Sequence, residues 1–113
     1  MQFVILRAIS VAFLIAVAQI YAQTQAAMNA QARADFRQAD AELNKTYQAV
    51  LAKLPDSESK EKLKQSQRAW LTFRDAEAAF AAGGGTMAPT LRYATMTELT
   101  EQRIKQLKLR LEE

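Results

Sequence analysis

The residues best suited to chemistry gather in one stretch, residues 65–77, around the only tryptophan of the chain, Trp70. Two arginines and an acid lie within five residues of it. At 3.6 residues per turn Gln67, Trp70 and Arg74 share one helix face, so polar groups flank a large aromatic ring. This pattern is typical either of a polar network that fixes the register of packed helices or of an exposed recognition patch built on Arg68, Trp70 and Arg74.

A second polar pair precedes this stretch. Asp40 and Asn44 are four residues apart, so they share a helix face beside an apolar stripe. A carboxylate there is expected to be partly buried, and it then needs a basic partner, for which Arg74 and Arg103 are the candidates. We interpret these residues as a network that fixes helix register rather than as a ligand site. Trp70 is likewise predicted to be a core anchor with a partner for its indole N–H.

The composition argues against catalysis. The chain has no histidine and no cysteine, which excludes thiol nucleophiles, Ser-His-Asp triads and Cys/His zinc sites. Asp40, Asp75 and Glu77 each have a basic neighbour, and no nucleophile accompanies them. The run Gly83 to Gly85 lacks the Lys and Ser or Thr of a phosphate-binding loop, so it predicts a turn. We predict that the chain is not an enzyme and uses no cofactor or metal.

The charge pattern argues against nucleic acid as a partner. The formal net charge is +3, from 15 basic and 12 acidic residues. Lys60, Lys62 and Lys64 are interleaved with Glu58 and Glu61, which is typical of a solvated helix face rather than of a basic patch.

The first residues, 1–22, have the form of an export signal. Arg7 precedes an apolar run, and small residues offer cleavage after Ala18 or after Ala22. The run is about half as long as the roughly 20 residues of a spanning helix, so we predict cleavage rather than a permanent anchor. The expected domain is 23–113. We expect the protein to be periplasmic or secreted and to meet the membrane only through its leader during export.

The rest of the chain is expected to form three helices. The first ends before Pro55, and residues 23–31, which have no fixed apolar face at their start, are expected to fray. The second runs from about Ser57 to Ala82, and the third from about Pro89 to Leu111. Their expected apolar stripes are Phe36, Ala39, Leu43, Tyr47, Val50 and Leu54; Leu63, Trp70, Phe73 and Phe80; and Met96, Leu99, Ile104, Leu107 and Leu111.

Local signals mark the ends of these helices. Asp56 or Ser57 is expected to cap the second helix, and the run Gly83 to Gly85 can adopt positive φ and reverse the chain. Pro89 suits the first turn of the third helix. We predict an all-α fold, an antiparallel three-helix bundle, with a helical hairpin plus a third helix that completes its core by dimerising as the alternative.

Three motifs in order give a resemblance. They have the forms D-x-x-L-N-x-x-Y from Asp40 and L-x-x-x-Q-R-x-W-x-x-x-R-D from Leu63, followed by a glycine turn and the segment 93–103. Together they resemble the LprI-type lysozyme inhibitor family, whose N-terminal domain is a small exported helical module, over about 28–107. The motif residues, interpreted as structural, are Asp40, Leu43, Asn44, Tyr47, Gln67, Arg68, Trp70, Arg74, Asp75 and Arg103.

The resemblance implies an exported binding protein, in some members an inhibitor of lysozyme. Lysozyme or another envelope protein is the implied partner, and a structural or interaction module of the cell envelope, with a homodimer as one form, is the alternative. Many members carry cysteines where this chain has Gln31 or a neighbour, Ala78 and Thr95, so helix packing must hold the domain without disulfides. The segment where we expect partner contact is the loop Gly83, Gly84, Gly85, Thr86 and Met87.

Overall fold

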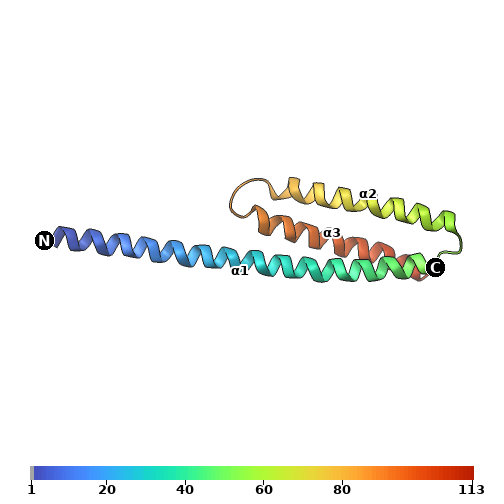
Figure 1. The fold of residues 1–113 in the computed structure, drawn as a ribbon, viewed down its shortest axis with the longest axis horizontal. Helices are drawn as coiled ribbons and strands as arrows, with labels where there is room; N and C mark the ends of the chain where they lie inside the picture. Colours follow the sequence, from blue (N-terminus) through green and yellow to red (C-terminus); the bar gives the residue numbers. More distant parts are fainter. Residues whose placement is uncertain (1) are drawn as a thin grey trace.

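The computed structural model describes residues 2–113, with side chains from Ser10 onward, and it contains three helices. They are α1 (Gln2–Lys53), α2 (Ser57–Ala82) and α3 (Ala88–Leu111). The chain reverses direction twice, so α2 runs antiparallel to both neighbours (Figure 1). Helix α3 packs on both α1 and α2, whereas α1 and α2 make few contacts with each other. The all-α fold predicted from the sequence is confirmed.

The ends of the helices follow the local signals. Helix α1 stops two residues before Pro55, and Asp56, in extended conformation, caps α2 by accepting a hydrogen bond from the Ser59 N–H at 2.7 Å. The candidate cap is therefore Asp56 rather than Ser57. Gly83 ends α2 with a φ of 63°, and its N–H donates to the Phe80 carbonyl at 3.3 Å.

The start of the first helix differs from the expectation. Residues 23–31 are helical rather than frayed, as part of one continuous α1. They are held by contacts with the beginning of α3, where Gln25 approaches the Met87 sulfur at 3.8 Å and the Thr90 hydroxyl donates to the Asn29 side chain. Polar docking therefore replaces the apolar face that this segment lacks.

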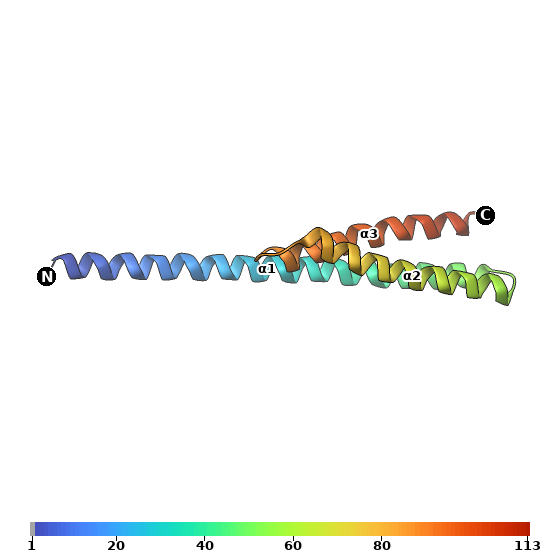
Figure 2. The ribbon, with the colours of Figure 1, turned by 90° about the horizontal axis from the view of Figure 1, so that it is seen from above.

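The N-terminal part of α1 extends beyond the other two helices, which gives the molecule a length of 84 Å and a cross-section of 21 by 16 Å (Figure 2). By length and composition alone, this part of the helix could cross a membrane. Its large apolar side chains from residue 11 to residue 21 are exposed. They are Val11, Phe13, Leu14, Ile15, Val17, Ile20 and Tyr21.

The apolar core lies chiefly between α1 and α3. Its buried residues are Leu43, Val50, Ile104 and Leu107, and the half-buried Tyr47, Leu63 and Trp70 pack against them. Helix α2 adds two small buried residues, Ala78 and Ala82. Trp70, predicted as a core anchor, packs against the core but is only half-buried, so its ring lies at the edge of the core rather than at its centre.

Two apolar predictions for α2 are wrong. Phe73 and Phe80 are 51% and 81% exposed. The buried face of α2 contains Gln67, Arg74 and Ala78, and both phenylalanines lie roughly 100–120° around the helix from Arg74. Helix α2 packs mainly on one neighbour, α3, so only a narrow stripe of α2 is buried.

Candidate functional site

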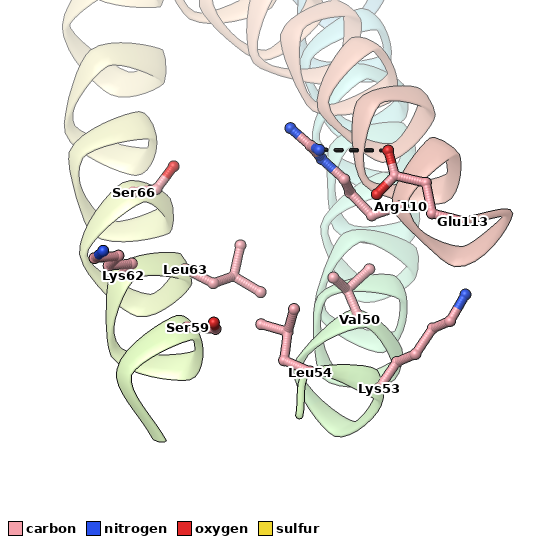
Figure 3. A pocket seen from close by; sticks show the side chains of 9 residues that line it. All are labelled: Val50, Lys53, Leu54, Ser59, Lys62, Leu63, Ser66, Arg110 and Glu113. Carbon is pink, nitrogen blue, oxygen red and sulfur yellow. Dashed lines mark hydrogen bonds and ion pairs between the residues drawn. The ribbon is translucent and has the colours of Figure 1, made fainter. Parts of the chain in front are cut away.

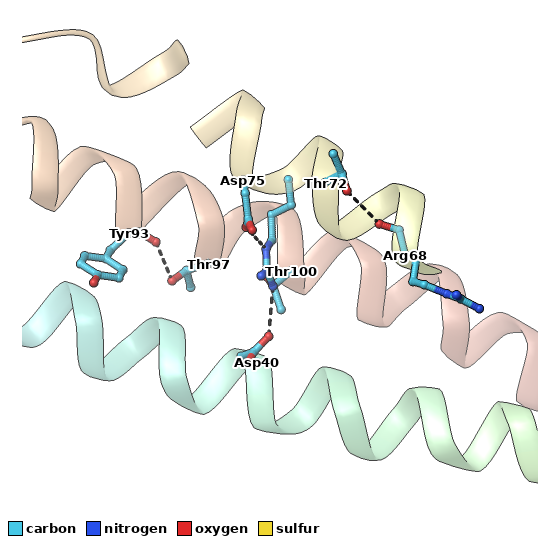
Figure 4. A network of polar contacts seen from close by, with 8 residues as sticks. Asp40, Arg68, Thr72, Asp75, Tyr93, Thr97 and Thr100 are labelled. Carbon is cyan, nitrogen blue, oxygen red and sulfur yellow. Dashed lines mark hydrogen bonds and ion pairs between the residues drawn. The ribbon is translucent and has the colours of Figure 1, made fainter. Parts of the chain in front are cut away.

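The polar centre of the molecule is Arg74, whose side chain is 7% exposed. Its Nη1 lies 3.0 Å from Oδ1 of Asp40 on α1 and 3.4 Å from Oγ1 of Thr100 on α3 (Figure 4). Its Nε lies 3.0 Å from Oδ1 of Asp75. One guanidinium therefore joins all three helices, and Arg74 is the partner of Asp40 out of the two candidates named from the sequence.

Aromatic rings surround the same cation. The Arg74 guanidinium carbon lies 5.0 Å from the ring centroid of Phe36 and 5.4 Å from that of Trp70. The Arg103 guanidinium lies 5.8 Å from the Trp70 ring. Each contact of this kind contributes about 0.5–1 kcal/mol when exposed and more when desolvated. We call the four residues the arginine–aromatic ladder.

Arg103, the second arginine of the ladder, is half-buried and has only neutral partners. Its Nε donates to Oε1 of Gln67 at 3.0 Å, its Nη2 to the Ser66 hydroxyl at 3.3 Å and its Nη1 to Oε1 of Gln106 at 3.3 Å. Burial, and secondly the charge of Arg110, lower the pKa of the Arg103 guanidinium. Within residues 10–113 no carboxylate lies within ion-pair distance of it.

The remaining motif residues are divided between the core and the surface. Leu43 is fully buried and Tyr47 packs against the core, whereas Asn44 and Arg68 are exposed. Asn44 and Asp40 therefore differ in their surroundings although they are four residues apart. Asn44, Tyr47, Gln67 and Arg68 line one shallow cavity of about 300 Å³ between α1 and α2.

Two members of the network were not identified from the sequence. Phe36 was assigned only to the apolar stripe, although it stacks on Arg74. Thr100 is fully buried and contacts the same guanidinium. Its signal in the sequence is a polar residue at the stripe position between Met96 and Ile104, where an apolar side chain is the norm.

The glycine loop forms a separate exposed feature beside α1. Gly83 and Gly85 have φ angles of 63° and 96°, and a Cβ placed on any of its three glycines meets no other atom within 4 Å. Thr86 is exposed, whereas Met87 is half-buried against Gln25. The loop therefore projects from the molecule and is anchored at its C-terminal end.

Titratable side chains in this structure do not converge as they do in catalytic or metal centres. Among residues 10–113 no three His, Cys, Asp or Glu side chains are placed to hold a metal ion. The acids of the network, Asp40 and Asp75, both contact the Arg74 guanidinium.

The family model described as "Lysozyme inhibitor LprI" matches residues 16–107. The chain belongs to the LprI family. This LprI protein is also 39% identical over 102 residues to an uncharacterized protein of Rhizobium meliloti (strain 1021), an alignment that covers 77% of this chain and 73% of that protein. No solved structure matches the chain described here. LprI proteins are named as inhibitors rather than enzymes, and the apolar N-terminal helix of this member is consistent with export.

Proposed function

We propose that this LprI protein is an exported inhibitor that blocks a lysozyme by occupying its substrate cleft. Membership of the family over residues 16–107 supports the activity, and the exposed loop Gly83–Met87 is the element that we assign to the cleft. In this proposal residues 1–22 are a leader that is removed on export, and the contact Gln25–Met87 then leaves the loop at one end of the remaining bundle.

The chemistry of the loop suits such a cleft. Lysozymes cleave with a pair of carboxylates that flank the scissile bond. The loop carries no acidic residue, and it offers backbone N–H groups and the Thr86 hydroxyl as hydrogen-bond donors. Three successive glycines make it thin enough to approach a recessed site. Its anchoring through Met87 and Thr90 lowers the conformational entropy that is lost on binding.

Charge makes a small contribution to this interaction. Without the leader and its Arg7 the chain keeps 14 basic and 12 acidic residues, a net charge of +2. A basic lysozyme is therefore not attracted over long distances, and affinity must come from the contact itself. We expect the inhibition constant to change little with salt concentration.

A muramidase clearing assay with the exported protein and lysozymes of several types tests the proposal. The expected result is loss of lysozyme activity at micromolar inhibitor. Gly84→Asp should abolish inhibition, since it places a carboxylate opposite the carboxylates of the cleft. Gly84→Ala is the matched control and should retain it, because Gly84 has no positive φ and open space around its Cβ position. Full lysozyme activity at micromolar excess of the wild-type protein would contradict the proposal.

The exposed aromatic face of α2 favours a second candidate, an interaction module of the cell envelope without inhibitory activity. Phe73 and Phe80 lie on one side of α2 and are 51% and 81% exposed. Exposed aromatic side chains grouped in this way mark contact surfaces. Size-exclusion chromatography with lysozyme distinguishes the two candidates. An inhibitor forms a new complex with lysozyme, whereas an interaction module elutes at its unchanged position. The module should instead lose its own partner or second copy in the variant Phe80→Ser.

Removal of the leader is tested by mass spectrometry of the exported protein. Cleavage after Ala18 or after Ala22 gives two distinct masses. Recovery of the full-length chain from the membrane fraction would instead identify α1 as an anchor.

A further inference from the structure

At the end of the bundle far from the glycine loop, the helices separate and leave a groove. One cavity of about 420 Å³ and one of about 370 Å³ lie there, and both are lined by Leu63, Ser66, Arg110 and Glu113. The two cavities therefore adjoin, and we call them together the end groove. Figure 3 shows the first of them between the start of α2, the end of α1 and the end of α3.

The floor of the end groove is apolar. Val50 of α1 and Leu54, just after its end, approach Leu63 of α2 in the first cavity (Figure 3), and Leu107 and Leu109 of α3 line the second. Leu63 lines both cavities, so one aliphatic side chain connects the two apolar floors. Cavities of this size with aliphatic walls and a few polar groups are typical sites for small organic ligands.

The rim of the groove is basic. Lys53, Lys62, Arg103 and Arg110 line it, against one acid, Glu113. Two of these cations already pair with a carboxylate: Lys62 with a glutamate at 3.1 Å and Arg110 with Glu113 at 3.5 Å. Lys53 donates to a backbone carbonyl at 2.7 Å, and Arg103 donates only to neutral side-chain oxygens. Of the last two, Arg103 is the half-buried one.

Arg103 has donors available for an anion. A guanidinium has five N–H groups, and the three neutral acceptors Ser66, Gln67 and Gln106 engage three of them. The group is half-buried, and no carboxylate pairs with it within residues 10–113. Arg110, two turns further along α3, lines the same cavity and adds a second cation, which holds Glu113 at 3.5 Å. A bound carboxylate would supply the missing negative charge, and arginine binds carboxylates through two parallel hydrogen bonds.

We propose that the end groove binds an aliphatic carboxylate of the fatty-acid class, with its carboxylate at Arg103 and Arg110 and its hydrocarbon chain along Leu63 toward Val50 and Leu54. Charge complementarity selects the anionic head, and the aliphatic floor selects the tail. The groove lies at the opposite end from the glycine loop, so this site is independent of lysozyme inhibition and both can operate in one molecule (Figure 1).

The only tryptophan of the chain provides the measurement. The Arg103 guanidinium lies 5.8 Å from the Trp70 ring, so an anion at Arg103 changes the electrostatic environment of the indole and its fluorescence. Decanoate, titrated into the exported protein below its micelle concentration, should give a saturable change in emission and one site by calorimetry. Acetate has the same head without the tail, and decyltrimethylammonium has the same tail with a cationic head. Neither should give a saturable response over the same range.

Variants locate the site. Arg103→Gln should weaken decanoate binding at least about tenfold, the effect of losing one charge-assisted contact. Arg110→Gln should do so as well, and calorimetry on this variant tests the site even if Arg103→Gln fails to fold. Arg92→Gln is the matched control at the other end of α3, where Arg92 stacks on Tyr93, and should bind as the wild type does. Absence of decanoate binding, an equal response to the cationic amphiphile, or wild-type affinity in both groove variants would overturn the proposal.

Discussion

The two interfaces of α3 are built from different chemistry. Against α1 it buries aliphatic side chains, with Leu43 and Val50 packed on Ile104 and Leu107. Against α2 its buried contacts are mainly polar, and two of the four buried residues of α2 are Gln67 and Arg74, the others being alanines. The first interface is close to what burial of apolar area alone would produce, whereas the second depends on matched donors and acceptors.

This difference teaches that stability and register are provided by different parts of the molecule. Apolar burial contributes about 1.5–3 kcal/mol for each fully buried Leu or Ile, without directional preference. Hydrogen bonds to a buried guanidinium add less net stability but hold only in one register. We therefore expect α2 to open more readily than α1 and α3, and its amides to exchange hydrogen faster than those of the α1–α3 core.

The strongest test of the comparison is a cavity in the aliphatic interface. Leu43 is fully buried, so Leu43→Ala should lower the free energy of unfolding by about 2–5 kcal/mol, a large part of the stability of a domain of this size. Thermal unfolding followed by circular dichroism should show a melting temperature lower by more than about 10 °C. Leu91→Ala, the same change at a side chain that is 45% exposed, should change it little.

The next largest effect is expected in the polar interface. Arg74→Gln removes the cation that joins the three helices, but it leaves Asp40 and Asp75 partly accessible to water, with side chains 36% and 60% exposed. The expected cost is therefore about 1–3 kcal/mol, with the increase in hydrogen exchange concentrated in α2. Arg68→Gln is the control on the same helix, since its surface ion pair contributes under about 1 kcal/mol. If Arg74→Gln cost more than Leu43→Ala, the polar interface would be the main source of stability.

A smaller effect is expected from the aromatic part of the ladder. Trp70→Leu keeps an apolar side chain at the edge of the core and removes two cation–π contacts, which should cost about 1–2 kcal/mol. Chemical denaturation measures the difference, with Phe73→Leu at an exposed site of α2 as the reference. A loss as large as that of Leu43→Ala would show that the ring is a true core residue.

The smallest effect concerns the start of α2 and depends on pH. The pKa of the Asp56 carboxyl is lowered, chiefly because the carboxylate accepts a hydrogen bond from the Ser59 N–H. The cap therefore stabilises the fold above the unfolded pKa of about 3.9 and is lost as the pH falls through the lower folded value. Asp56→Asn should melt like the wild type at pH 7 and lose less stability between pH 5 and pH 2, whereas Glu98→Gln at an exposed site should follow the wild type.

Helix bounds could be predicted from the sequence because their signals are local. Pro55, Asp56 and the three glycines act through their own backbone, so α2 was placed at its observed residues. The exposure of Phe73 and the docking of Asn29 depend on where another helix lies, and a pattern within one helix does not contain that information.

The candidate site was predictable to a similar degree. That Asp40 pairs with an arginine of another helix followed from the cost of an isolated buried charge, but the choice of Arg74 over Arg103 did not. The contacts of Phe36 and Thr100 with that arginine required the arrangement of all three helices. The role of the glycine loop in binding stays a prediction.

The central position of α3 also sets the timing of folding. This helix is synthesised after α1 and α2, which share few contacts with each other. While only α1 and α2 have been made, the chain therefore has little core on which to collapse, and assembly waits for α3. Such a late trigger keeps the chain open while α1 and α2 emerge, which suits the export that we propose.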